Sequence, residues 1–295
     1  MNWLEEMRNG GDYDCILGLS GGVDSSYLAH LAVNVWGLNC LAVTFDNGWN
    51  TDIANENIRI IVDKLGLDHI VGHCDEDELN AIHRTFVMSR LPDVDIPTDL
   101  AYLRFTFDKM YEYNIKYYLS GANPNTEIPQ PIKWSLIDDT YMMDVLGGAP
   151  ISLPRLTPEF YLKHVQDHKE FRPFRFIEVP PDDVIKDFLE KEYGWQKYGG
   201  KHCENIYTRW TIYDHLYRLH GIKKWENYIG YGREFVDDLN MVLDRLHIDE
   251  KEHFELIKLG GKLDRSGYKN NFDFWKKNRK KLQGKVPDSF WRKYC

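Results

Sequence analysis

Apolar and polar positions alternate along the first 120 residues in a way that predicts strands separated by helices. Short apolar runs at residues 14–19, 40–45, 69–71 and 115–119 have the length and composition of buried strands. Between these runs, apolar residues recur at helical spacing, and the helix predicted to end at Leu65 is followed by Gly66 as a stop signal. Strands that alternate with helices form a parallel sheet, because parallel neighbours need a crossover connection. We therefore expect an α/β fold with a doubly wound parallel sheet.

The regular alternation stops in the middle of the chain. Nine prolines fall within residues 124–181, and we expect an irregular structure there. Helical patterning returns at residues 182–193 and continues to about residue 259, with an aromatic stripe that we interpret as a buried helix face: Tyr207, Trp210, Tyr213 and Tyr217. The sequence therefore predicts an α/β domain at residues 1–150 and a mostly helical region with a basic tail at residues 151–295.

Composition places the chain among water-soluble proteins. Hydrophobic residues make up 43% and charged residues 28% of the sequence, and no apolar run approaches the ~20 residues of a membrane helix. The first eleven residues lack the apolar core of a signal peptide, so we expect a cytoplasmic protein that does not contact membranes. The five cysteines are widely spaced and form no C-x-x-C pair, which predicts free thiols rather than disulfides or a zinc site.

Charge is distributed unevenly along the chain. The net charge is -9, yet residues 262–295 carry eleven Lys and Arg against three Asp. The same tail interleaves aromatic side chains with the basic ones: Phe272, Phe274, Trp275, Phe290 and Trp291. Such a segment can bind nucleic acid or dock on an acidic surface. We favour docking on the acidic remainder of the chain and keep nucleic acid as the less favoured partner.

The strongest chemical signal is the polar loop at residues 20–26, Ser-Gly-Gly-Val-Asp-Ser-Ser, between the first predicted strand and a helix. Its glycines allow close backbone approach, and N–H groups at the start of a helix attract anions. Neither a Walker loop nor a Rossmann fingerprint is present. Two more polar turns, at residues 46–50 and 120–127, follow other strands, so we expect all three to converge on one crevice. The alternative is a turn that only joins strand to helix.

This loop pattern resembles the PP-loop of the ATP pyrophosphatases, or adenine nucleotide α-hydrolases. The resemblance implies that the loop binds the β- and γ-phosphates of ATP, and that ATP is cleaved between the α- and β-phosphates as a substrate oxygen becomes adenylated. It assigns the pyrophosphate contacts to Ser20, Gly21, Gly22, Ser25 and Ser26. It makes Asp24 the ligand of Mg²⁺, an ion that prefers oxygen ligands beside phosphates.

The other two turns complete the nucleotide site that the resemblance implies. The adenosine would contact Thr44 and Phe45, with Asp46 and Asn47 near the ribose or the metal, and the α-phosphate would lie beside Gly121 and Asn123. Asp46 and Asn123 are also residue types that form ordinary turns, and that alternative stays open for both.

Longer blocks narrow the resemblance. AVTFDNGWNTDIANENI, LPDVDIPTDLA, IKYYLSGAN and GWQKYGGKHCENIYTRW are similar to the N-acetyl sugar amidotransferase family of lipopolysaccharide O-antigen biosynthesis, over about residues 14–221. In that family, ATP activates an acetamido group on a nucleotide-linked sugar, and ammonia from a separate glutaminase converts it to an acetamidino group. The chain has no glycine-flanked cysteine of a glutaminase, as expected of an enzyme that receives its ammonia.

Three consecutive residues after a Gly-Gly pair are further catalytic candidates. Lys201 could neutralise charge on the phosphates, and His202 could act as an acid or base near neutral pH. Cys203 is either a small apolar residue of the core, which we favour, or a carrier of persulfide sulfur. In the second case the protein would be an ATP-dependent sulfurtransferase that thiolates a small molecule or a tRNA base. A regulatory subunit that only binds nucleotide is the least favoured alternative, because Asp24 and all the loop serines are present.

Overall fold

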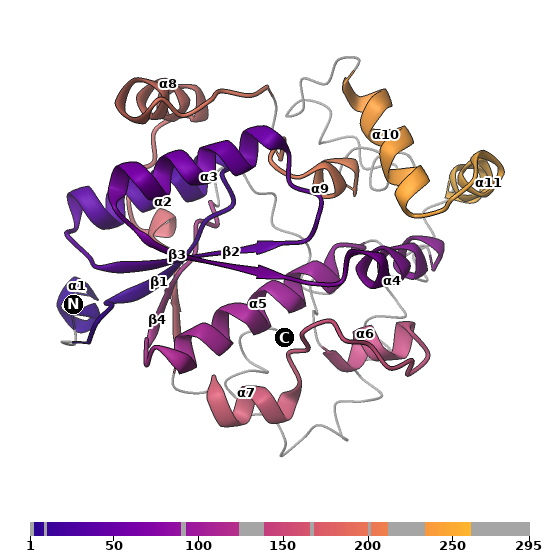
Figure 1. Ribbon diagram of the computed structural model, residues 1–295, viewed down its shortest axis with the longest axis horizontal. Helices are drawn as coiled ribbons and strands as arrows, with labels where there is room; N and C mark the ends of the chain where they lie inside the picture. The colour runs from indigo at the N-terminus through magenta and orange to yellow at the C-terminus, as the bar shows by residue number, and fades with distance from the viewer. Residues whose placement is uncertain are drawn as a thin grey trace.

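The computed structural model describes residues 3–8, 11–89, 93–123, 139–165, 168–199, 202–211 and 234–260. Its centre is a five-stranded parallel sheet with the strand order β3-β2-β1-β4-β5 (Figure 1). The strands are β1 (Cys15–Gly18), β2 (Cys40–Asp46), β3 (Asp68–His73), β4 (Tyr117–Leu119) and β5 (Lys169–Phe171). The predicted α/β fold with a doubly wound parallel sheet is confirmed.

Helices cover both faces of the sheet. One face carries α2 (Val23–His30), α3 (Asp52–Leu65) and α8 (Asp182–Tyr193), and the other carries α5 (Ile96–Glu112) and α7 (Pro158–His164) (Figure 1). The remaining helices are α1 (Trp3–Met7), α4 (Glu76–Met88), α6 (Asp139–Val145), α9 (Ile206–Trp210), α10 (Glu234–Arg245) and α11 (Glu250–Gly260). Most of these lie beyond the carboxyl ends of β1 and β2, where ligands of such sheets bind (Figure 1). The helical content predicted for the C-terminal region is confirmed by α8 to α11.

Local signals in the sequence account for the boundaries of the helices. Thr51 accepts a hydrogen bond from the Ala54 N–H at the start of α3, and Gly66 ends that helix in a left-handed conformation with φ of 62°. Asp75 accepts from the Glu78 N–H at the start of α4. The end of α3 at Gly66 is the stop position that the sequence predicts.

The central strands are buried on both faces, as expected where helices cover a parallel sheet. β1 pairs with β2 from Cys15 opposite Cys40 to Gly18 opposite Val43. The two thiols of this pair lie 3.4 Å apart within the core. The cysteines of the described part of the chain are free thiols, as predicted.

Two features of the fold differ from the sequence pattern. A three-residue fifth strand, β5, lies in the proline-rich stretch and pairs with β4. The sheet thus continues past residue 150, and the division into two domains stays a prediction. In addition, residues 31–35 form a π-helical turn, and the Val35 side chain is 59% exposed although Val35 falls at helical spacing with the buried Leu28, Leu31 and Ala32. A wider turn rotates the side chains that follow it away from that face.

Several predicted features lie outside the described residues. These are Lys201, the stripe residues Tyr213 and Tyr217, and the basic tail. The stripe residues that are described, Tyr207 and Trp210, are buried as predicted. Within the described ranges, no helix is both long enough and apolar enough to cross a membrane.

Candidate functional site

A cavity of about 1030 Å³ opens at the carboxyl ends of β1, β2 and β4. Its wall includes Ser20 and Asp24 from the first polar turn, Asn47 from the second, and Ser120 and Gly121 from the third. The carboxyl ends of parallel strands meet at one edge of the sheet, which is why turns that are distant in sequence share this cavity. The structure therefore brings the described parts of the three turns together as the strand pattern predicts, and residues 124–127 of the third turn lie outside the described residues.

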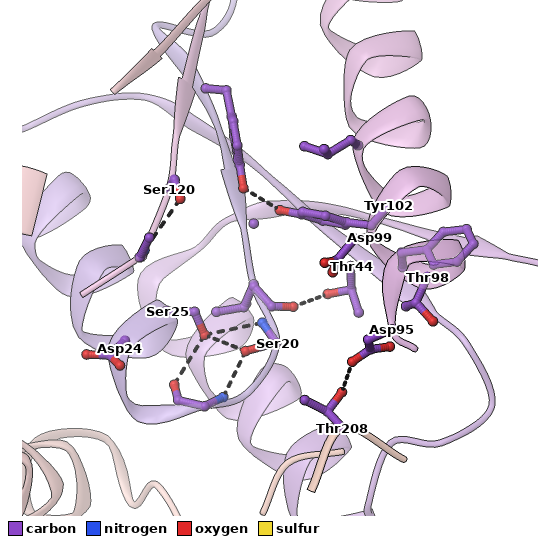
Figure 2. Close-up of a pocket in the computed structure, with 18 of the residues that line it drawn as sticks. Ser20, Asp24, Ser25, Thr44, Asp95, Thr98, Asp99, Tyr102, Ser120 and Thr208 are labelled. Carbon is purple, nitrogen blue, oxygen red and sulfur yellow. Dashed lines mark hydrogen bonds between the residues drawn. The ribbon is translucent and has the colours of Figure 1, made fainter. Parts of the chain in front are cut away.

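The first turn presents hydroxyl and N–H groups at the start of α2. The Ser20 and Ser25 hydroxyls lie 3.1 Å apart, the Ser20 N–H donates to the Ser25 hydroxyl at 3.2 Å, and the Gly22 N–H donates to the Ser20 hydroxyl at 3.3 Å (Figure 2). Gly22 precedes the helix and supplies no side chain to cap it. Residues 22–25 line the cavity, so the start of α2 lies at its wall, as in an anion-binding site.

Gly21 holds this turn against the start of α3. Its φ is +76°, and a Cβ atom placed there would lie 2.3 Å from the backbone oxygen of Ala54. A side chain is excluded because the backbone of another helix occupies its space. Gly21 itself is not in the cavity wall, so it shapes the loop through its conformation rather than through a side chain.

Asp24 is joined to the third turn. The side-chain amide of Asn123 donates to the Asp24 carboxylate at 2.8 Å, and Asn123 is only 1% exposed. Asn123 therefore fixes the position of the acidic group in the cavity wall instead of lining the wall itself. This contact with Asp24 is neither of the two roles considered for Asn123, a place beside the α-phosphate or a simple turn, and both of these stay predictions.

The second turn is divided between two cavities. Thr44, Phe45 and Asn47 line the large cavity, and the Thr44 hydroxyl donates to the Leu19 carbonyl at 2.6 Å. Asp46 lines a smaller neighbouring cavity of about 310 Å³ and accepts from the Gly48 N–H at 2.9 Å. Asp46 thus acts as a turn former, the alternative that the sequence left open.

Two more predicted site residues, besides Gly21, Asp46 and Asn123, lie outside the wall of the large cavity. Ser26 is fully buried, and its hydroxyl accepts from the Trp195 indole N–H at 3.2 Å, so it anchors α2 to the segment after α8 rather than facing phosphate. Cys203 is 6% exposed and donates to the Gly199 carbonyl. Burial raises the pKa of the Cys203 thiol, which disfavours the thiolate that a sulfur carrier needs. The position of Ser26 does not support its predicted contact with pyrophosphate. The position of Cys203 agrees with the favoured interpretation as a core residue and does not support the alternative role of sulfur carrier.

The segment between α8 and α9 closes over the first turn. The Val23 N–H, in the first turn of α2, donates to the Tyr198 hydroxyl at 3.1 Å. Glu204 and His202 also line the cavity, and the Glu204 carboxylate lies 3.6 Å from the His202 ring nitrogen. The Thr51 N–H donates to the Glu204 carbonyl at 3.0 Å, which holds the segment to the start of α3. His202, a predicted catalytic residue, therefore lies in the cavity wall. Tyr198 and Glu204 also lie there, although no sequence pattern indicated them.

An acidic wall faces the first turn from the start of α5. Figure 2 shows Asp95, Thr98 and Asp99 on this side of the cavity. The Thr208 hydroxyl donates to the Asp95 carboxylate at 2.8 Å, and burial raises the pKa of the Asp95 carboxyl. These residues lie in a block that carried the family resemblance, but their spacing alone gave no reason to place them opposite residues 20–26.

A pair of tyrosines lines the cavity beside the end of β1. The hydroxyls of Tyr102 and Tyr118 lie 2.9 Å apart (Figure 2). A Cβ atom on Gly18 would lie 1.9 Å from the Tyr102 hydroxyl, so the glycine is what lets the ring approach the strand. The pair joins α5 to β4 and gives this part of the cavity a rigid aromatic lining.

The donor set can be compared with what Mg²⁺ requires. In the described part of the chain, no group of three or more His, Cys, Asp and Glu lies close enough to hold a metal ion by itself. Two carboxylates stand beside the turn that would hold the phosphates: Asp24, and Glu204, whose Oε1 would lie 3.1 Å from a Cβ atom placed on Gly22. Magnesium bound to nucleotides takes one or two protein carboxylates together with phosphate oxygens, so this arrangement fits the ion.

Comparison with known proteins supports the interpretation of the first turn. Residues 6–122 match the family model described as asparagine synthase. The match spans residues 20–26 and the strands β1 to β4, and it leaves β5 and everything after it unmatched. The first part of the chain is therefore similar to a domain of this family, which is of the PP-loop ATP pyrophosphatase type. No curated protein matches the chain.

Solved structures show a distant likeness over most of the chain. NMN synthetase from Francisella tularensis is 14% identical with a TM-score of 0.40, over 83% of this chain and 90% of that one. The NH3-dependent NAD synthetase from Campylobacter jejuni is 14% identical with a TM-score of 0.37, over 86% and 96% of the two chains. The U34-tRNA thiolase from Methanococcus maripaludis is 17% identical with a TM-score of 0.35, over 84% and 79%. Likeness at this level gives no evidence on the substrate of this chain.

Proposed function

We propose that this protein is an ATP-dependent, AMP-forming amidotransferase. It adenylates an amide or carbonyl oxygen of a small substrate, replaces that oxygen with ammonia-derived nitrogen, and releases AMP and pyrophosphate. The observation that carries the proposal is the loop at residues 20–26, of which residues 20 and 22–25 line a cavity of about 1030 Å³. Ligand pockets usually measure roughly 300–1,000 Å³, so this cavity has room for ATP and a second molecule.

Different residues of the cavity wall would bind the phosphates, the adenosine and Mg²⁺. Ser20, Ser25 and the first N–H groups of α2 would hold the β- and γ-phosphates, with Thr44 and Phe45 near the adenosine. Asp24 would hold Mg²⁺, which when bound neutralises phosphate charge. The α-phosphate would then lie beside Gly121. A Cβ atom added at Gly121 would lie 3.4 Å from the backbone of Ser25.

Adenylation and amidation follow in sequence at this point. The substrate oxygen attacks the α-phosphorus, an O–P bond forms, and the bond to the bridging oxygen breaks, so pyrophosphate leaves with the electron pair. Ammonia then adds to the activated carbon and loses a proton, and the C–O bond breaks to release AMP. His202 and Asp95 line the same cavity and are the groups that could accept that proton.

The acceptor and the nitrogen source are proposed from the sequence resemblance. We propose an acetamido group on a nucleotide-linked sugar as the acceptor, and a separate glutaminase as the source of ammonia. The cavity opens where the carboxyl ends of the strands meet, so a small acceptor and ammonia could reach the same point.

The direct test is the product pattern. Incubation with ATP, Mg²⁺, an ammonium salt and candidate acetamido sugars should yield AMP and pyrophosphate in equal amounts, with a product in which nitrogen replaces oxygen. Chromatography of the nucleotides and mass spectrometry of the sugars measure both. Formation of ADP instead of AMP would contradict the proposal. The Cys203→Ser variant should keep most of this activity, because the thiol is buried outside the cavity wall; a persulfide-based sulfur transfer would be lost in the same variant.

Tyr198 gives a test of the phosphate site that the sequence did not offer. Its hydroxyl accepts from the Val23 N–H, so the hydroxyl hydrogen remains available for a phosphate oxygen at the same helix start. We expect Tyr198→Phe to weaken ATP binding about tenfold, the effect of one hydrogen bond to a charged group. Isothermal titration calorimetry with Mg²⁺ and ATP measures the change.

A matched control is Tyr193→Phe. The Tyr193 hydroxyl bonds His30 and Asn34 at a distance from the cavity, so this variant should bind ATP as the unmodified protein does. Equal affinities for Tyr198→Phe and Tyr193→Phe would show that Tyr198 serves only the packing of its segment.

A further inference from the structure

The cavity extends past the third turn to the end of β5. The Ser120 N–H donates to the Phe171 carbonyl at 3.0 Å, so the turns that follow β4 and β5 lie side by side. Arg172, Arg175 and Phe176, which follow β5, line the cavity together with Gly121. This end of the cavity comes from the proline-rich stretch and is not used by the nucleotide site described above.

This end of the cavity carries positive side chains, whereas the charged side chains elsewhere in the wall are acidic. Among the described residues that line the cavity, the lysine and arginine side chains are Arg172 and Arg175. The same wall contains seven Asp and Glu side chains: Asp24, Asp95, Asp99, Asp139, Glu170, Asp182 and Glu204. Of these, Asp139 is paired with Arg155 and Glu170 with Arg172. An anionic group entering the cavity is repelled by the acidic wall, so its favourable positions are the helix start at residues 20–26 and this arginine pair.

The two arginines lie on one short turn of the chain, and both line the cavity. Arg172 is oriented by Glu170, whose carboxylate accepts from the Arg172 Nε–H at 2.7 Å. Arg175 follows within one short turn, because its N–H donates to the Arg172 carbonyl at 3.2 Å, and its side chain is exposed. Guanidinium groups bind phosphate and carboxylate in planar, two-point contacts, and two of them at one site favour such an anion.

An exposed aromatic ring completes this end of the cavity. Phe176 is 72% exposed although it is a large apolar residue. Its ring stacks on Phe171 with 5.6 Å between centroids and 1° between planes, so the ring is held in place while one face stays open. A rigid aromatic face beside a charged pair suits a ligand that has a ring next to an anionic group.

We propose that Arg172, Arg175 and Phe176 form the acceptor subsite, and that the acceptor is a ring compound carrying a phosphate or carboxylate group. This proposal rests on the proposed function and adds to it the place and the charge of the acceptor. The strand order then sets the order of the ligands: adenosine at β2, the phosphates at β1, the reacting α-phosphate at β4 and the acceptor at β5. The acceptor oxygen would approach the α-phosphate from the β5 side.

The test is a binding experiment on the full chain with the nucleotide site filled. Mg²⁺ and α,β-methylene ATP, which cannot be cleaved between the α- and β-phosphates, are added first. Calorimetric titrations then use N-acetylglucosamine 1-phosphate, N-acetylneuraminate and neutral N-acetylglucosamine. We expect at least one of the two anions to bind ten times more tightly than the neutral sugar or better, and the stronger of the two identifies phosphate or carboxylate as the recognised group.

Substitutions assign that preference to the arginine pair. Arg175→Gln should reduce the preference for the anion to less than threefold, whereas Lys191→Gln, an equal change of charge on the exposed side of α8 and outside the cavity, should leave it intact. Phe176→Ala should weaken charged and neutral probes alike. The inference is overturned if the neutral sugar binds as tightly as the anions, if neither anion binds, or if Arg175→Gln keeps the preference.

Failure of the proposed acceptor subsite can be distinguished from failure of the proposed function. Affinity for α,β-methylene ATP is measured in the same series, and Arg175→Gln should not change it. A protein that binds the ATP analogue but shows no anion preference contradicts the acceptor subsite alone. A protein that does not bind the analogue contradicts the nucleotide site on which the proposed function depends.

Discussion

Replacing Gly21 with alanine is expected to abolish ATP binding and to lower the free energy of unfolding by about 4 kcal/mol. The added Cβ would lie 2.3 Å from the carbonyl oxygen of Ala54 and 2.9 Å from its carbonyl carbon. Both are backbone atoms at the start of α3, so no side-chain rotation relieves the overlap. The φ of +76° adds the cost of a left-handed residue, about 1–2 kcal/mol. Urea unfolding and ATP titration measure the two effects.

The chain offers matched controls for this substitution. Gly66 and Gly194 have φ of +62° and +79°, and nothing lies within 4 Å of a Cβ added at either position. Gly66→Ala and Gly194→Ala should therefore show only the conformational cost, roughly 1 kcal/mol, with unchanged affinity for ATP. If Gly21→Ala were no less stable than these two variants, the turn would not be held against α3 as the structure describes.

Asp24→Asn is expected to lower the rate of AMP formation at least about a hundredfold, the usual size of the loss when one electrostatic contact to a reacting phosphate site is removed. The substitution keeps the shape of the side chain and removes its charge. ATP binding in the absence of Mg²⁺ should stay the same or become tighter, because a negative group beside the phosphates is lost. Steady-state assays across a range of Mg²⁺ concentrations separate the two effects.

The control for Asp24→Asn is Asp52→Asn. Asp52 occupies the first turn of α3 as Asp24 occupies the first turn of α2, but it is exposed and outside the cavity. Loss of the favourable interaction with the helix start should be small in both variants, about 0.3–1 kcal/mol. Asp52→Asn should therefore keep its activity, and an equal loss in both variants would mean that Asp24 acts only on helix stability.

The sheet and its loop could be predicted because both depend on local signals. β1 and β2 are continuous apolar runs, and Ser20 to Ser25 follow the first of them directly. β5 could not be predicted in the same way, since a three-residue strand of Lys, Glu and Phe has no periodicity to detect. Its place in the sheet depends on pairing with β4, which is a contact between segments far apart in the sequence.

The residues of the candidate site also differ in whether local sequence or tertiary contacts determine their positions. The sequence by itself determined the nucleotide end, because a loop between a strand and a helix carries its own backbone N–H groups wherever the chain folds. Only the tertiary structure decided which other residues meet that loop. It brought Tyr198 and Asp95 to the cavity wall and turned Ser26 and Cys203 away from it. It also placed Arg172 and Arg175 at the far end of the cavity, because residues after an edge strand take their positions only once that strand has paired with its neighbour.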